Sequence, residues 1–212
     1  MSFNRIAAIG GIIGVVLLIL NGVLLGNQPA LDVSIEEVRQ YIGEDAAMHR
    51  TAMVFGIATL PFYAVFFSGV AMRLRDSDRE HGEGWAIVAI VGAILLFATA
   101  AIGDTMAVVL FLRGGDGLDD SAVRALYDTW LVSYGSIGVA VAALTGSVAI
   151  ATLRHRIWPT WYGWLAALVA IIGFISVGGV AWTSTALVLV FAVFIGILVW
   201  TLVTSVLMYR EG

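Results

Sequence analysis

The chain has 212 residues, of which 60% are hydrophobic and only 12% are charged, and its net charge is −4. A soluble domain of this size could not bury so much apolar surface, so the composition predicts one membrane-embedded domain. It also excludes a nucleic-acid partner, which would require a basic patch. Cysteine and lysine are both absent, which excludes disulfides, thiolate metal sites, cysteine nucleophiles and a retinal Schiff base.

Six continuous apolar runs follow one another along the chain, at about 6–26, 51–72, 85–112, 123–153, 161–180 and 186–208. A helix of ~20 residues crosses a hydrocarbon core of about 30 Å, and backbone groups in lipid must be satisfied within their own segment. The first run is longer than a usual signal-peptide core, and no small-residue cleavage site follows it. We therefore expect an all-α, polytopic transmembrane helix bundle with six spans, in which residues 1–212 form a single domain.

The arginines predict the orientation of these spans. With the N-terminus inside, seven arginines fall in cytoplasmic segments and four in extracytoplasmic ones, and the seven lie close to the span ends. Because cytoplasmic loops carry an excess of basic residues, we expect both termini in the cytoplasm.

The first outer loop contains a signal for a short helix. Ser34 is followed three residues later by Glu37, which fits a capping box. We expect an extracytoplasmic surface helix near 34–42, on the outer membrane face or over the mouth of the bundle. A solvated helical linker is the alternative. In the second outer loop, the Asp119–Ser121 cluster predicts the start of the fourth helix.

Small residues recur at intervals of four inside two spans. Gly10 and Gly14 lie in the first span, and Gly138, Ala142 and Gly146 lie in the fourth. Such residues let helices approach closely, since packing holds spans together in lipid. We expect them to pack within the bundle, although a seam between copies in a homo-oligomer is the alternative.

Asp104 is the most informative single residue, because it lies within the third apolar run. In the predicted orientation it is ~9 Å outward of the midpoint of that run. A carboxylate there costs several kcal/mol unless it is paired, hydrated or protonated, so an ionisable residue inside a span is a candidate functional group. The alternative is a structural ion pair with an arginine from a neighbouring helix.

Several polar residues are expected on the same side of the membrane as Asp104. They predict a polar binding pocket that is open to the outside and covered by the 34–42 helix, with Arg50 as the preferred ion partner of Asp104 or Asp128 because its forked donors match a carboxylate. Arg124 and Asp128 lie four apart and could pair along their helix. His49 could sense pH or bind a metal, or simply be hydrated. The predicted binding residues are Asn21, His49, Arg50, Asp104, Arg124, Tyr127 and Asp128.

Other chemistries lack the residues that they need. The three histidines, His49, His81 and His155, lie at helix ends or in loops, where they could not hold an intramembrane haem. No zinc motif, serine-protease triad or P-loop is present. We therefore expect no cofactor, no metal and no catalytic residue set.

Three segments resemble a family of six-span membrane proteins of unknown activity that are common in actinobacteria. They are the outer stretch Gln28–Val38, the end of the second span at Met72–Arg75, and Ile157–Leu165 at the start of the fifth span. The resemblance implies six spans in a bacterial plasma (inner) membrane. It carries over no functional residue, because the family has no established activity.

Three functions fit these observations. The sparse polar interior and the lack of a catalytic constellation favour a non-enzymatic accessory or scaffold protein, whose partners would be the lipid bilayer and a larger membrane complex. The second is a binder or transporter of a small molecule or lipid, which would use the pocket around Asp104. The third is an enzyme acting on lipid or envelope substrates, with Asp104 or Asp128 as general base.

Overall fold

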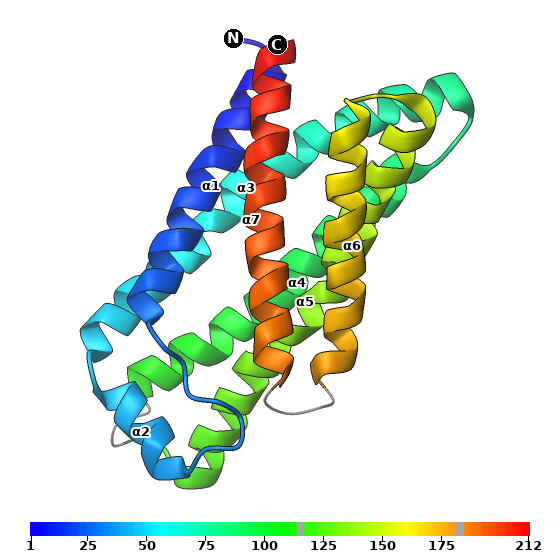
Figure 1. The fold of residues 1–212 in the computed structure, drawn as a ribbon. Coiled ribbons are helices and arrows are strands. Elements are labelled where there is room, and N and C mark those ends of the chain that lie inside the picture. Colours follow the sequence, from blue (N-terminus) through cyan, green and yellow to red (C-terminus); the bar gives the residue numbers. More distant parts are fainter. Residues whose placement is uncertain (114–116, 181–184) are drawn as a thin grey trace.

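The computed structural model describes residues 1–113, 117–180 and 185–212, and side chains outside 178–187. These residues form helices and no strand (Figure 1). Six of the helices are long and apolar enough to cross a membrane, which confirms the predicted all-α bundle. The helices are α1 (Phe3–Leu25), α2 (Ile35–Gly43), α3 (Ala46–His81), α4 (Trp85–Arg113), α5 (Asp120–His155), α6 (Thr160–Val180) and α7 (Thr185–Glu211).

The six long helices form a closed ring. Each packs against its neighbours in the order α1, α3, α4, α5, α6, α7 and back to α1. Both chain termini lie at one end of this ring, with the α3–α4 and α5–α6 loops (Figure 1). We call this the termini end and the opposite one the α2 end.

Helices α3 and α5 extend beyond the apolar runs that predicted them. Each has 36 residues and is therefore about 54 Å long, whereas the predicted spans were 51–72 and 123–153. The polar segment Arg73–His81 continues α3 because nothing in it breaks a helix. The helix ends only at Gly82, whose φ of 68° is left-handed and suits a residue without a Cβ.

Small residues bring the helices of the ring together. A Cβ on Gly10 would lie 2.9 Å from the Phe62 carbonyl oxygen, and one on Gly14 would lie 3.2 Å from the Tyr63 ring, so α1 rests directly on α3. Gly138 in α5 faces Gly173 in α6. The prediction that these glycines pack within the bundle is confirmed, and the homo-oligomer stays a prediction.

Helix α2 packs across the end of the bundle that lies opposite the chain termini (Figure 1). Ser34 is its N-cap, and its hydroxyl accepts from the Glu37 amide at 3.3 Å. Val38 and Ile42 are buried in an apolar cluster with Met53, Phe111 and Trp130. Arg39 ties α2 to the start of α5, since it donates to the Asp120 carboxylate at 2.7 Å.

Glu83 ties the α3–α4 loop to the end of α5. Its carboxylate accepts from His155 and Arg154, both at 2.9 Å, and from the Trp85 indole at 2.5 Å. The bond with His155 is the main reason that the pKa of Glu83 lies below its ordinary value. A lowered pKa means that this carboxylate stabilises the fold above its unfolded-state pKa, and that the contribution is lost as the pH falls through the folded-state value.

Glu83→Gln should therefore lower the melting temperature slightly at pH 7, and the difference from the wild type should shrink once the pH falls below the ordinary glutamate pKa of 4.5. Thermal unfolding of both proteins between pH 3 and pH 8 would measure this. Glu80→Gln is the matched control, because Glu80 is exposed and has no hydrogen-bond or ion partner among the described residues. A difference that persists unchanged in acid would contradict the assignment.

Candidate functional site

Asp104 lies on the buried face of α4, between α5 and α3. Its side chain is buried, with 7% of the residue exposed. The Tyr134 hydroxyl in α5 donates to its Oδ1 at 2.9 Å. No other described residue donates a hydrogen bond to this carboxyl, and none forms an ion pair with it, so Oδ2 has no donor from the described part of the chain.

Asn21 of α1 also lines the space beside Asp104. Its Nδ2 donates to the Ala52 carbonyl of α3 at 2.8 Å. A Cβ on Gly56 would lie 3.0 Å from this Nδ2 and 3.8 Å from the Asp104 Oδ2. Both polar side chains therefore lie beside Gly56, which has no side chain to fill the space next to them.

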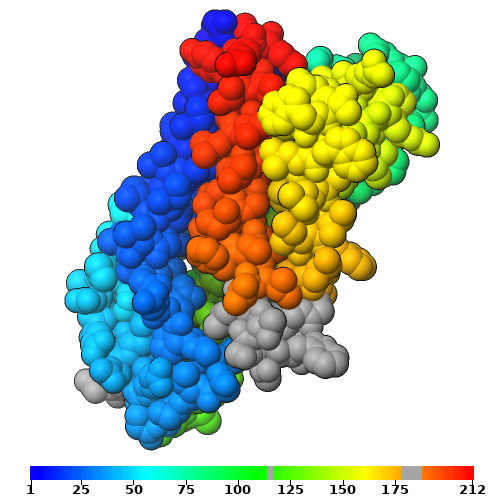
Figure 2. All heavy atoms as spheres, viewed as in Figure 1, coloured from blue at the N-terminus to red at the C-terminus, as the bar shows by residue number. Residues whose placement is uncertain are grey.

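A cavity of about 110 Å³ lies beside these groups, at the centre of the ring. Five helices line it, α1, α3, α4, α5 and α7. Most of its wall is apolar, and the polar side chains in it are Asn21, Thr59, Tyr63, Asp104 and Tyr134. In Figure 2, green atoms from the middle of the chain are visible between the lower parts of α1 and α7, two of the helices that line the cavity.

The electrostatics of this cavity are unusual because it contains a carboxyl group and no basic residue in its lining. Thr59 is satisfied locally, since its hydroxyl donates to the Gly56 carbonyl at 2.6 Å. A carboxylate in apolar surroundings is costly unless a proton, a cation or further donors compensate it. The arrangement can therefore bind a proton, or a ligand that brings a cationic or hydrogen-bond-donating group to Oδ2.

The other predicted site residues form a second group, nearer the α2 end. Arg124 donates to the carbonyl oxygens of Leu31 and Val33, and the Tyr127 hydroxyl donates to that of Pro29 at 2.6 Å. These residues hold the loop between α1 and α2 against α5. The predicted pairing of Arg124 with Asp128 is present at 3.9 Å.

His49 and Arg50 also lie outside the Asp104 cavity. The imidazole of His49 is buried between the Tyr41 and Phe111 rings, with centroid distances of 4.6 Å and 4.8 Å, and its Nδ1 has no hydrogen-bond partner. Arg50 is exposed and donates to the Ala46 carbonyl of its own helix at 3.1 Å.

The expected ion pair between Arg50 and Asp104 or Asp128 was therefore wrong, and the predicted residues do not line one common cavity. The physical reason is that Arg50 and Asp104 lie at different heights along the bundle. Asp104 lies level with Gly56, and Arg50 is six residues, or about 9 Å, nearer the start of α3. Of the predicted residues, only Asn21 joins Asp104 in the cavity. The roles of the predicted residues in binding stay a prediction.

Sequence reasoning missed Tyr134, the partner that holds Asp104. A signal was present, because Tyr134 is a polar aromatic residue within the fourth apolar run. Within residues 1–113, 117–180 and 185–212, no group of three histidine, aspartate or glutamate side chains could hold a metal ion.

Comparison with protein-family models, curated proteins and solved structures found no match to this chain, so its resemblance to the actinobacterial six-span family stays a prediction.

Proposed function

We propose that the protein binds a small amphipathic molecule inside the bilayer, with the apolar body of the ligand in the central cavity and a cationic or hydrogen-bond-donating group on Asp104. One observation carries this proposal. Asp104 is buried against an apolar cavity, has a single hydrogen bond, and leaves Oδ2 without a donor from the described residues.

The size and lining of the cavity narrow the ligand class. A volume of about 110 Å³ is comparable with apolar protein cavities of roughly 150 Å³ that take up benzene. The ligand body is therefore about the size of one ring or a short branched chain. A protonated amine is the group that best compensates a carboxylate in surroundings without another cation. Small hydrophobic amines are the class that we expect to bind.

The membrane setting of this function is also a proposal. The arginine distribution supports cytoplasmic termini, which would put α2 on the outer side and Asp104 in the outer half of the bilayer. The resemblance to the actinobacterial six-span family implies a bacterial plasma membrane. An accessory role in a larger complex and an enzymatic role for Asp104 or Asp128 remain predictions.

Binding of matched probes tests the proposal. Benzylamine and toluene differ by one amino group, and equilibrium dialysis against protein in nanodiscs, with empty nanodiscs as blank, measures their affinities. The wild type should bind benzylamine more tightly than toluene. Asp104→Asn should lose about tenfold or more of the benzylamine affinity, as expected for one charge-assisted hydrogen bond, and should bind toluene unchanged.

Two further variants make this test specific. Asp128→Asn removes the same charge from a residue that lies outside the cavity, so it should leave both affinities unchanged. Gly56→Ala adds a methyl group 3.0 Å from the Asn21 amide and should weaken both probes by narrowing the cavity. A wild type that binds neither probe, or an Asp104→Asn variant that binds benzylamine as well as the wild type does, would refute the proposed function.

A further inference from the structure

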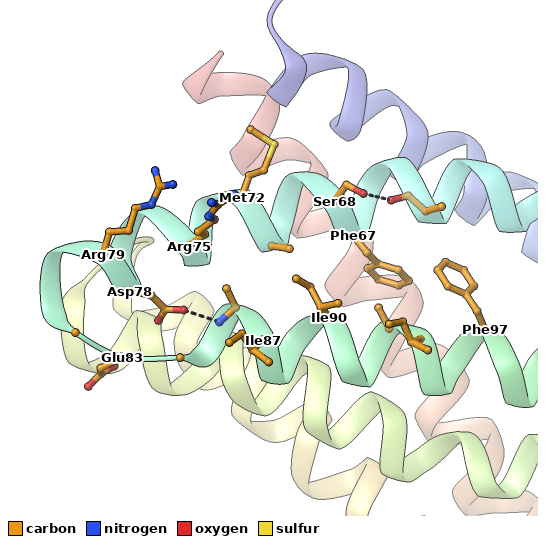
Figure 3. Close-up of a pocket in the computed structure, with 17 residues that line it drawn as sticks. Phe67, Ser68, Met72, Arg75, Asp78, Arg79, Glu83, Ile87, Ile90 and Phe97 are labelled. Carbon is orange, nitrogen blue, oxygen red and sulfur yellow. Dashed lines mark hydrogen bonds between the residues drawn. The ribbon is translucent and has the colours of Figure 1, made fainter.

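A groove separates α3 from α4 at the termini end of the bundle (Figure 3). Its volume is about 860 Å³, much larger than that of the central cavity. On α3 it runs from Ala64 to Arg79, and on α4 from Ala86 to Phe97. The rings of Phe67 and Phe97, 5.7 Å apart, belong to the walls of both the groove and the central cavity.

Most of the groove is apolar and open to its surroundings. Figure 3 shows Phe67, Ile87, Ile90 and Phe97 along the space between the two helices. Ile87, Ile90 and Ile94 are 68%, 44% and 60% exposed. The apolar part of the α3 lining, from Ala64 to Met72, is about 12 Å long, which is close to the ~15 Å depth of one bilayer leaflet. One acyl chain of a membrane lipid could therefore lie along the groove over most of the depth of its leaflet.

The polar end of the groove carries two available positive charges. Arg75 and Arg79 are one helical turn apart on the same side of α3, and both are exposed. Neither forms a hydrogen bond or an ion pair with any residue in the described part of the chain. Two guanidinium groups with this spacing are well suited to a phosphate, which they can bind through charge-assisted hydrogen bonds.

The acidic residues of the same lining are already engaged. The Asp78 carboxylate accepts from the backbone amides of Trp85 and Ala86, as Figure 3 shows for Asp78 and the start of α4. Glu83 is bound by Arg154 and His155. Asp76 and Glu80 are exposed but do not line the groove. The charge that the groove itself offers to a ligand is therefore positive.

From these observations we infer that the α3–α4 groove is a binding site for one anionic membrane phospholipid. Its phosphate binds Arg75 and Arg79, and one of its acyl chains lies against Phe67, Ile90 and Ile94. The apolar length of the groove argues for a lipid rather than free phosphate, and the two unpaired arginines argue for an anionic headgroup rather than a zwitterionic one. This groove adjoins the Asp104 cavity at Phe67 and Phe97, but the inference does not depend on the proposed function.

Native mass spectrometry of the full-length protein, titrated with phosphatidylglycerol or with phosphatidylcholine of identical acyl chains, tests the inference. The wild type should bind phosphatidylglycerol roughly tenfold more tightly, as expected for two arginines near a membrane surface. The double variant Arg75→Gln/Arg79→Gln should lose this preference. Arg156→Gln/Arg210→Gln is the matched control, because it removes two exposed arginines at the same end of the bundle that do not line the groove.

Two further measurements distinguish a bound lipid from bound inorganic phosphate. Ala71→Phe places a ring in the lining of the groove and should weaken both lipids. Millimolar inorganic phosphate should not displace phosphatidylglycerol. Equal binding of the two lipids by the wild type would overturn the inference, as would a control double variant that loses as much preference as Arg75→Gln/Arg79→Gln. Displacement by inorganic phosphate would overturn the assignment to a lipid.

Discussion

Gly138→Ala is expected to destabilise the bundle by about 1–3 kcal/mol, the usual cost of overpacking an interior, even though alanine is the better helix former by about 1 kcal/mol. At this position α5 and α6 touch backbone to backbone. A Cβ on Gly138 would overlap the Gly173 carbonyl oxygen and the Ser176 hydroxyl, and a Cβ on Gly173 would lie 2.7 Å from the Gly138 carbonyl oxygen. The serine can rotate, but the carbonyl can move only if the two helices separate.

The same helix offers a matched control. Gly146 lies two turns further along α5, where an added Cβ would meet the Ala170 Cβ at 3.6 Å, an ordinary contact. Gly146→Ala should therefore be neutral, or stabilising by up to about 1 kcal/mol. Thermal unfolding in one detergent would compare both variants with the wild type. If Gly138→Ala and Gly146→Ala behave alike, the close crossing of α5 and α6 is not a determinant of stability.

Much of this architecture follows from features that the sequence displays directly. A run such as Trp85–Leu112 is apolar over a length that only a membrane-spanning helix explains. The pair Ser34 and Glu37 predicts where a helix starts, because capping depends on local spacing and not on tertiary contacts. The spacing of Gly138, Ala142 and Gly146 likewise predicts a close helix contact, although not which helix makes it.

The contacts of the site were harder to predict. The depth of a residue along the bundle, and the helix that its side chain faces, are fixed only when the helices assemble. In an amphipathic soluble helix, polar residues mark the outward face, but a span such as α4 is apolar all round and its sequence gives no face. The sequence places Asp104 in the half of its span that is nearer Arg113, yet a difference of less than two turns decides whether it meets Arg50 or Tyr134. Charge complementarity predicted an arginine as the partner of Asp104, whereas in the folded bundle the partner is Tyr134.

The loop contacts show a second limit. Arg124 and Tyr127 were expected to bind a ligand because polar groups beside a buried acid suggest a pocket. In the structure they bind the main-chain carbonyls of the loop between α1 and α2. Backbone carbonyls are available at every residue and leave no mark in a sequence, so this anchoring role cannot be read from side-chain patterns.

Asp78→Ala should cost about 2 kcal/mol or more, because two backbone amides lose a charged acceptor at once. Asp78 lies in α3, but its carboxylate accepts from the amides of Trp85 at 3.1 Å and Ala86 at 2.7 Å. These are among the first amides of α4, which have no partner within their own helix. The negative charge also lies at the positive end of the α4 dipole. One side chain thus caps the next helix and closes the α3–α4 loop.

Asp78→Asn should lose less stability than Asp78→Ala, because an asparagine keeps one acceptor oxygen and gives up only the other, together with the charge. Asp76→Ala is the control, because Asp76 is exposed and bonds to no residue of the described chain. Unfolding curves should show the lowest stability for Asp78→Ala, an intermediate stability for Asp78→Asn and the highest of the three for Asp76→Ala. If this residue caps α4, hydrogen exchange at the Trp85 and Ala86 amides should increase most in Asp78→Ala, less in Asp78→Asn and not at all in Asp76→Ala. Unchanged exchange there would show that water replaces the carboxylate without loss and that the loop is held by Glu83 instead.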